Sequence, residues 1–481
     1  MPQPSLRPGG FPQPLAIPVA LALVGALLPW LIWAWFRFPA IGGADPGLWE
    51  AAALRVSRGD PSPVAAAYPI LITGLVRLLG VGWDQAGLAI AAACFAALGP
   101  VTWLLARNLG VSPALAGIAG LLALGEPWLA LGALQAQPDT LSALAFLLAV
   151  LAALAWVQRP GWPRLIPLLL AIALVPQVRE HAPVISAGLL VLLAVAPGGV
   201  ADRVERLVFA LILLFFVPTL LGETMVLPWQ QAWVRYRWGE IFRDFASHRA
   251  PSFLDGTPRA YAEAFRAAYA DHDHLRIAWL HTSLNVHHGW TPWAWMGLGF
   301  VGWLLAGRRR WVLMIGLLPL LAVPGGAQQP RHVAVLVPLA AACMVAGLRH
   351  AGRWRLWVAA AVGLVLVTLA WARPGRAVED HRGRCEHRVM LRDEALLVRA
   401  LAGSDAVLIS GNPRYLIYCD LETADVATAA RIAAPLVWVG DLPRERPQDW
   451  PSFEAEGFAE VPTGSPKLIL YLRPAKGTSR P

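Results

Sequence analysis

The stretch that decides the fold is LAIPVALALVGALLPWLIWAWF, residues 15–36, followed after a short gap by GADPGLWEAAALR, residues 43–55. The first run is long enough to cross the ~30 Å hydrocarbon layer of a bilayer as a helix. It has no small-residue cleavage site, so it predicts a retained transmembrane helix rather than a signal peptide. Asp45 stands where this run leaves the membrane, and Asp-Pro-Gly is typical of the start of a short helix.

The composition extends this reading to most of the chain. Of 481 residues, 57% are hydrophobic and only 15% are charged, whereas soluble domains carry about 25% charged residues. Apolar runs recur as far as Trp371 and predict about eleven membrane spans. Arg clusters separate these runs, so the net charge of +9 is expected to set the topology and not to bind nucleic acid. The predicted fold is an α-helical polytopic membrane protein.

Loop charges predict the orientation of the chain in an inner (plasma) membrane. Residues 1–14 form a Pro/Gly-rich cytoplasmic tail, and residues 15–372 form the transmembrane domain. In this register, each short loop that must be cytoplasmic contains Arg. Two longer loops, 38–67 and 222–290, are expected on the outer side. The polar remainder, residues 373–481, is then an extracytoplasmic domain.

Local patterns refine these expectations. Residues 113–134 read as a single span, and residues 68–80 are apolar but too short to assign to a span or to the interface. Strand-like runs alternate with helix-like stretches after Trp371, which predicts a small α/β domain; the runs are residues 406–410, 435–439 and 468–472. No Gly-rich phosphate loop follows a strand, so no nucleotide site is expected. An extracytoplasmic location would allow a disulfide between Cys385 and Cys419.

Charged residues gather at the outer ends of the predicted spans. Asp45 is either a helix cap or a general base. Asp139 is either a cap of the following helix or a residue that faces a substrate. Glu50 and Arg55 share the short helix after Asp45, and they face either the site or solvent. Two further groups are basic and lie where the positive-inside rule does not favour Arg: Arg179-Glu180-His181 and Arg331-His332. For both, a lipid-headgroup anchor is the alternative to a ligand site.

These segments resemble the GT-C superfamily of membrane glycosyltransferases, in particular the family 39 enzymes of the protein mannosyltransferase and lipid A aminoarabinose transferase types. The resemblance covers roughly residues 15–348. It lies in the order of the apolar segments and in several motifs: Asp45 to Trp49, Tyr68-Pro69 through Gly80, Pro138-Asp139, and Arg331-His332 with Pro338. The chain departs from the pattern at Pro46, where many relatives carry a second acid.

The resemblance implies a glycosyltransferase that uses a polyprenyl-phosphate-linked sugar and an envelope acceptor on the outer side of the bilayer. Asp45 would be the catalytic base of an inverting transfer, since one carboxylate suffices for a single displacement. Three basic residues would bind the donor phosphate: Arg331, His332 and Arg179. Five further residues would contact substrates: Glu50, Arg55, Tyr68, Asp139 and His181.

Two other functions and one cofactor remain open on sequence alone. A flippase or transporter for lipid-linked saccharides would place polar residues along its spans. An O-antigen polymerase or ligase would centre on Arg235, Arg237 and Arg243 of the long loop. Acids and histidines of residues 271–288 allow a divalent cation, although their spacing favours a solvated loop over a metal site. No other cofactor is indicated.

Overall fold

The structure is a computed structural model of the whole chain. It describes residues 15–40, 46–59, 62, 64–179, 182–196, 199–220, 263, 264, 266–268, 270, 271, 273, 276, 280, 290–305, 310–318, 330–348, 352–372, 375–410, 418, 419, 421–423, 431–440, 457–463 and 468–475. All structural statements below concern these residues.

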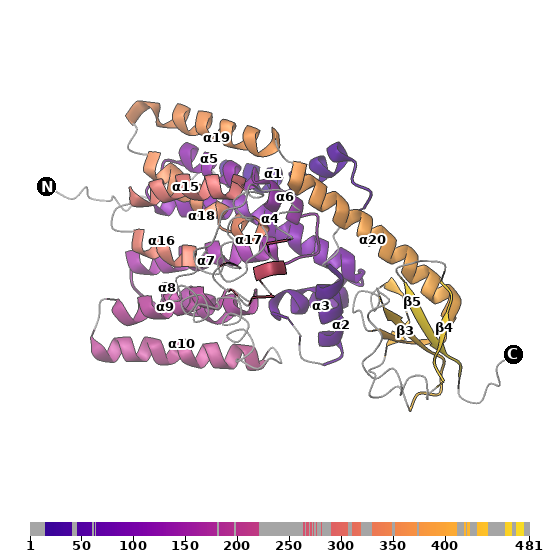
Figure 1. Cartoon of the computed structure of the whole chain (residues 1–481). Coiled ribbons are helices and arrows are strands. Elements are labelled where there is room, and N and C mark those ends of the chain that lie inside the picture. The colour runs from indigo at the N-terminus through magenta and orange to yellow at the C-terminus, as the bar shows by residue number, and fades with distance from the viewer. Residues whose placement is uncertain are drawn as a thin grey trace.

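The chain is predominantly helical, and its helices form one bundle with a long helix leading to a small sheet (Figure 1). The helices are α1 Ala16–Phe36, α2 Pro46–Ser57, α3 Ala67–Leu79, α4 Trp83–Asn108, α5 Pro113–Leu124, α6 Pro127–Gly132, α7 Asp139–Gln158, α8 Trp162–Leu174, η1 Val175–Gln177, α9 Pro183–Val195, α10 Val200–Leu220, α15 Trp290–Leu304, α16 Arg310–Leu317, α17 Pro330–Ala334, α18 Val337–Leu348, η4 Gly352–Trp354, α19 Arg355–Ala372 and α20 Gly375–Ala402.

The bundle contains helices of the length and composition that membrane spans require, as the sequence predicts. Three described helices, α1, α4 and α7, are long and apolar enough to cross a bilayer, and seven shorter apolar helices accompany them. Glycines let some of these helices approach closely. For example, a Cβ on Gly299 of α15 would lie 2.6 Å from the Cβ of Ala340 in α18, and a side chain at Gly302 would overlap the backbone of Cys343.

The expected single span at residues 113–134 is wrong, because the chain breaks there into α5 and α6. The break follows from Glu126-Pro127, since proline disfavours a helical conformation of the preceding residue. Glu126 adopts φ −77° and ψ 120°, and its carboxylate accepts a hydrogen bond of 2.7 Å from the Leu129 N–H. The same residue thereby ends one helix and caps the next.

The predicted C-terminal α/β unit is confirmed, and it contains a five-stranded sheet of order β2-β1-β3-β5-β4. The strands are β1 Val407–Ser410, β2 Glu422–Thr423, β3 Leu436–Gly440, β4 Ala459–Val461 and β5 Ile469–Arg473. β1 pairs in parallel with β2 and β3, while β5 runs antiparallel to β3 and β4. Leu391, Ala395 and Val398 of α20 cover one face of the sheet.

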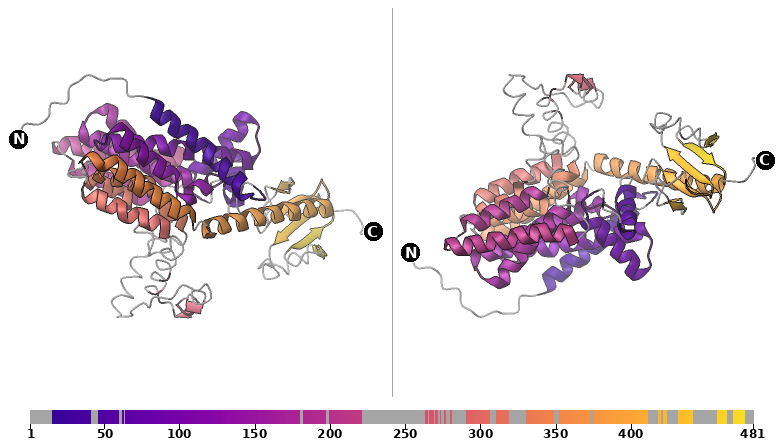
Figure 2. Two further views of the ribbon diagram at one scale, coloured as in Figure 1. Left: turned by 90° about the horizontal axis from the view of Figure 1, so that it is seen from above. Right: turned by 90° about the horizontal axis from the view of Figure 1, so that it is seen from below.

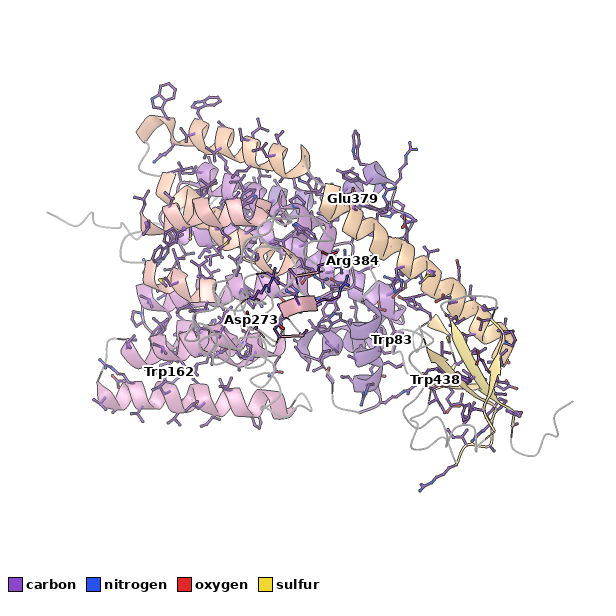
Figure 3. The ribbon with its side chains drawn as sticks, viewed as in Figure 1. Trp83, Trp162, Asp273, Glu379, Arg384 and Trp438 are labelled. Carbon is purple, nitrogen blue, oxygen red and sulfur yellow. The ribbon has the colours of Figure 1, made fainter. Side chains whose placement is uncertain are left out.

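Helix α20 joins the bundle to the sheet. Its 28 residues span about 42 Å, and both further views show it reaching from the bundle to the strands (Figure 2). Figure 3 shows Trp83 on the bundle side of this junction and Trp438 on the sheet side. Cys385 and Cys419 are free, buried thiols, so the allowed disulfide is not formed. Cys385 contacts the Ala40 backbone, whereas Cys419 packs in the core beside the sheet.

Candidate functional site

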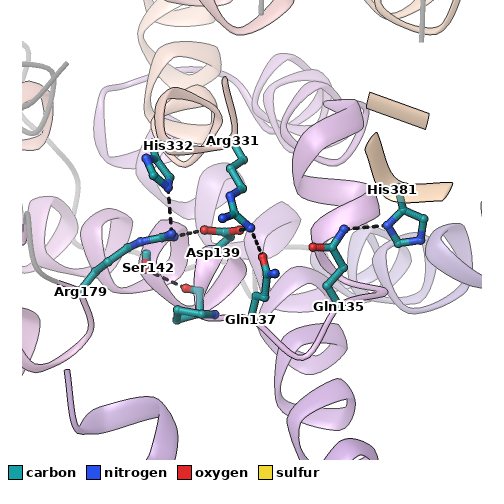
Figure 4. Close-up of polar contacts among 9 residues, drawn as sticks. Gln135, Gln137, Asp139, Ser142, Arg179, Arg331, His332 and His381 are labelled. Carbon is teal, nitrogen blue, oxygen red and sulfur yellow. Dashed lines mark hydrogen bonds and ion pairs between the residues drawn. The ribbon is translucent and has the colours of Figure 1, made fainter. Parts of the chain in front are cut away.

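A polar cluster forms at the end of the bundle where α6, α7 and α17 meet. It consists of Gln137, Asp139, Arg179, Arg331 and His332, which we call the anion cluster (Figure 4). Local sequence explains the placement of each part. Pro138 starts α7 with Asp139 in its first turn, η1 ends just before Arg179, and Pro330 starts the short helix α17 that presents Arg331 and His332.

Asp139 is the centre of the anion cluster. Its carboxylate forms an ion pair with Arg179 and a second one with Arg331, whose Nη1 lies 3.7 Å from Asp139 Oδ2. The Arg179 Nη2 atom donates to His332 Nε2 at 3.0 Å, and Arg331 donates to the Gln137 side-chain oxygen. Three segments far apart in sequence are thereby tied together. Asp139 is the first residue of α7, and Pro138 is the N-cap residue. The alternative prediction that Asp139 caps this helix is therefore wrong.

The charge and burial of the anion cluster favour an anionic ligand. Asp139 and Arg179 are only 2% and 5% exposed, whereas Arg331 and His332 are partly exposed. Among the described residues, two guanidinium groups face one carboxylate, and Arg331 is the guanidinium on the accessible side. Guanidinium groups bind phosphate oxygens in a two-pronged fashion. Arg331 and His332 can therefore bind a phosphate group, while the buried Asp139 carboxylate holds the two arginines in place.

An apolar groove leads away from the anion cluster along α7 and α8. Its volume is about 470 Å³, and it is lined only by apolar side chains, from Ala145 to Ala155 on α7 and from Pro167 to Val178 on α8 and η1. Val178, at one end of the groove, directly precedes Arg179. The lining of the groove and the anion cluster are therefore adjacent in the chain at Val178 and Arg179.

The other predicted site residues group around α2, and they differ in exposure. The predicted short helix is present, starting at Pro46, while Asp45 itself lies outside the described residues. Glu50 is fully buried, and Tyr68 beside it is also buried, donating a 2.9 Å hydrogen bond to the Gly87 carbonyl. Arg55 is exposed. Glu50 therefore points into the protein, whereas Arg55 is accessible from outside.

Glu50 belongs to a second charged group, for which α20 supplies the cations. Arg388 is fully buried and lies 3.9 Å from Glu50 Oε1, and it also forms an ion pair with Asp84. Arg392 reaches the same Asp84 oxygen at 2.7 Å. Burial raises the pKa of Glu50 from 4.5 to about 7, and the two arginines act in the opposite direction.

Sequence patterns did not single out Asp84, Arg388 or Arg392. The available signal was periodicity within α20: positions 381, 385, 388 and 392 fall on one helical face. Position 181 and residues 235, 237 and 243 lie outside the described residues. Within the described part of the chain, no three His, Cys, Asp or Glu side chains lie close enough to hold a metal ion.

Comparison with known proteins finds likeness in structure only. No protein-family model and no curated sequence matches the chain. ArnT from Cupriavidus metallidurans, solved bound to undecaprenyl phosphate, superposes with a TM-score of 0.52 at 12% identity, over 95% of this chain and 97% of ArnT. The same ArnT in the apo state gives 0.51 at 13% identity over the same shares.

A third solved structure is less similar. The oligosaccharyltransferase of Archaeoglobus fulgidus, in complex with zinc and sulfate, gives a TM-score of 0.47 at 14% identity, over 95% of this chain and 72% of that one. The ArnT superpositions extend over nearly the whole of both chains. They confirm the predicted GT-C architecture at the level of the fold.

Proposed function

We propose that this chain, a multi-pass membrane protein with the GT-C fold, transfers a sugar from a polyprenyl-phosphate carrier to a cell-envelope acceptor on the outer side of the membrane. The observation that carries the proposal is the anion cluster beside an apolar groove. A polyprenyl phosphate has these two chemical parts, one anionic and one apolar, joined end to end. The ArnT structure bound to undecaprenyl phosphate supports the same class of ligand.

The phosphate of the donor binds Arg331, His332 and Arg179 in this proposal. Its negative charge increases as the bond between the sugar C1 and the phosphate oxygen breaks. A cation already in place stabilises the transition state more than the ground state, and this difference accelerates the reaction. Asp139 and Gln137 hold the two arginines, so little reorganisation is needed when the charge develops.

The isoprenoid tail of the donor occupies the groove between α7 and α8. Burying apolar surface contributes roughly 25 cal/mol per Å², so the tail supplies affinity while the phosphate supplies position. Val178 borders the groove and the next residue, Arg179, belongs to the anion cluster, which supports this placement of the tail and the phosphate.

Asp45 serves as the general base. Its carboxylate accepts the proton of the acceptor hydroxyl, the acceptor oxygen forms a new bond to C1, and the carrier phosphate departs with the electron pair of the old bond. A hydroxyl has a pKa far above 7, so attack at neutral pH requires such a base. One displacement inverts the configuration at C1. Four other residues proposed to contact substrates lie within the described part of the chain: Glu50, Arg55, Tyr68 and Asp139.

The proposed orientation places the N terminus in the cytoplasm and the C-terminal domain outside. Arg107 in the last turn of α4 and Arg164 in the first turn of α8 lie at one end of the bundle, in keeping with the positive-inside rule. The anion cluster and α20 lie at the other end, where Gln135 and His381 are joined by a 2.7 Å hydrogen bond. A reporter enzyme fused after Trp371 is expected to be active only outside, and cytoplasmic activity would contradict this orientation.

Binding of unmodified polyprenyl phosphate tests the donor site directly. Arg331→Gln is expected to weaken binding to the purified protein at least tenfold, because it removes a charged contact worth about 1.5–3 kcal/mol. Arg331→Lys keeps the charge but lacks the planar guanidinium, so its affinity should lie between those of the wild type and Arg331→Gln. Arg206→Gln, at the opposite end of the bundle, serves as the control and should bind normally. Unchanged affinity of Arg331→Gln would exclude this residue from the phosphate site.

A further inference from the structure

One face of helix α20, which carries polar side chains, lies against the bundle. His381, Cys385 and Arg388 on this face are buried, and Arg392 continues it at the edge. Each residue contacts a different segment of the bundle: His381 contacts Gln135, Cys385 contacts the Ala40 backbone, and Arg388 contacts α2 and α4. The face is therefore an interface built from specific polar pairs and not a solvated side of a helix.

Arg388 is the most deeply placed charge of this interface. It is completely buried, it forms ion pairs with Glu50 of α2 and with Asp84 in the first turn of α4, and its guanidinium lies 5.8 Å from the Tyr418 ring centre. Arg392 lies 5.7 Å from the same ring. One side chain thus joins α2, α4, α20 and the residues beside the sheet.

The state of Glu50 shows why this contact matters to α2. Neither carboxylate oxygen of Glu50 accepts a hydrogen bond from the described residues, and the side chain is fully buried. A buried carboxylate without a partner is very unfavourable. The ion pair with Arg388 is therefore what compensates Glu50, and it holds the face of α2 that points into the protein.

The other end of the same face contacts the loop that precedes the anion cluster. The Gln135 side-chain N–H donates to His381 Nδ1 at 2.7 Å, and His381 packs edge-on against Phe38 with 4.4 Å between ring centres. Gln135 stands two residues before Gln137, which accepts from Arg331. Helix α20 consequently contacts both the helix that follows Asp45 and the loop that carries Gln137 of the anion cluster.

We propose that α20 is a clamp from the C-terminal domain that holds α2 in position for catalysis, and that Arg388 and Glu50 are its positioning residues. The clamp rests on the proposed glycosyl transfer for its functional meaning. Asp45 is covalently attached to the first residue of α2, so a displacement of α2 moves the base relative to the donor. Misplacement by about 1 Å can cost a factor of about 100 in rate.

This role predicts a specific kinetic signature. Arg388→Gln and Glu50→Gln lower kcat at least tenfold and leave the KM for the polyprenyl-linked donor within twofold, because the anion cluster itself is intact. Arg388→Lys keeps the charge and restores part of kcat. The double variant Glu50→Gln/Arg388→Gln loses less than the product of the two single losses, since each partner acts through the other.

Hydrogen exchange tests the clamp without relying on activity. In Arg388→Gln, backbone amides of α2 are expected to exchange at least tenfold faster, while amides of α7 keep their protection. Arg382→Gln is the matched control, because Arg382 is an exposed arginine of the same helix that contacts Phe36, whose carbonyl accepts its hydrogen bond at 3.0 Å, and the Phe38 ring. It should alter neither exchange in α2 nor kcat.

The two measurements separate the clamp from the enzymatic function. Faster exchange in α2 together with lower kcat supports the clamp, and faster exchange in a protein that transfers no sugar keeps the contact but removes its proposed purpose. Wild-type protection of α2 in Arg388→Gln overturns the clamp, whatever the activity. An equal loss of protection in α2 and α7 overturns it as well, since Arg388 would then stabilise the whole fold.

Discussion

At the residue scale, the contribution of the buried charges to stability can be tested most directly. Asp139 is the only described carboxylate that pairs with Arg179 and Arg331. Asp139→Asn keeps the shape but removes the negative charge that pairs with the buried Arg179 and with the partly exposed Arg331. Removing one partner of a buried ion pair costs about 3–5 kcal/mol. We expect a clear drop in the thermal unfolding temperature of the protein in detergent.

Asp202→Asn is the control for this measurement. Asp202 forms a 4.0 Å pair with Arg206 and its side chain is 61% exposed, and such pairs contribute about 0–1 kcal/mol. If Asp139→Asn melts like Asp202→Asn, the charges of the anion cluster are not held as described.

Glu50 predicts a dependence of stability on pH. Its pKa in the folded protein is raised from 4.5 to about 7 by burial, against the opposing effects of Arg388 and Arg392, with Asp84 and Tyr68 as the other ionisable neighbours. The folded state then binds its proton more tightly than the unfolded state, so stability falls as pH rises from about 4.5 to about 7 and is level above. Melting temperatures of wild type and Glu50→Gln, measured between pH 5 and 8, check this. The melting temperature of the variant should depend less steeply on pH than that of the wild type. Parallel curves would show that Glu50 does not titrate in this range.

At the element scale, the sequence predicted helices better than their contacts. Apolar runs indicate α1, α4 and α7 because a membrane requires such lengths. The short helix after Asp45 and the three main strands also followed from local patterns. The break at Glu126 was missed, although the Glu-Pro pair carried the signal. Arg388 was missed for a different reason, since a single sequence does not indicate which distant acids a helical face will meet.

Helix α15 offers a test of how closely the bundle packs. Gly302→Leu is expected to prevent proper assembly, because a side chain there overlaps the backbone of Cys343 in α18. Gly297→Leu, on the same helix, meets nothing within 4 Å and should be tolerated. The yield of monodisperse protein after detergent extraction measures both variants. Equal yields would mean that α15 and α18 do not approach as described.

At the scale of the whole molecule, α20 contacts both the bundle and the C-terminal sheet. The predicted phosphate-binding residues Arg179, Arg331 and His332 come together in the fold, although 152 positions separate the two arginines in the chain. The resemblance could indicate these residues because the order of GT-C segments fixes which outer ends meet. It could not indicate the polar junction with α20, which lies beyond the stretch that the resemblance covers.

The most direct test of the account follows sugar transfer from a labelled polyprenyl-phosphate sugar by purified wild type and Asp45→Asn, with donor binding measured in the same samples. The account predicts transfer to an envelope acceptor by wild type. It predicts normal donor binding by Asp45→Asn with transfer reduced at least a hundredfold, since general bases contribute about 10²–10⁴ in rate. Transfer by Asp45→Asn at the wild-type rate would contradict the assignment of the base. If the wild type binds the donor but transfers its sugar to no envelope fraction, the proposed reaction is contradicted.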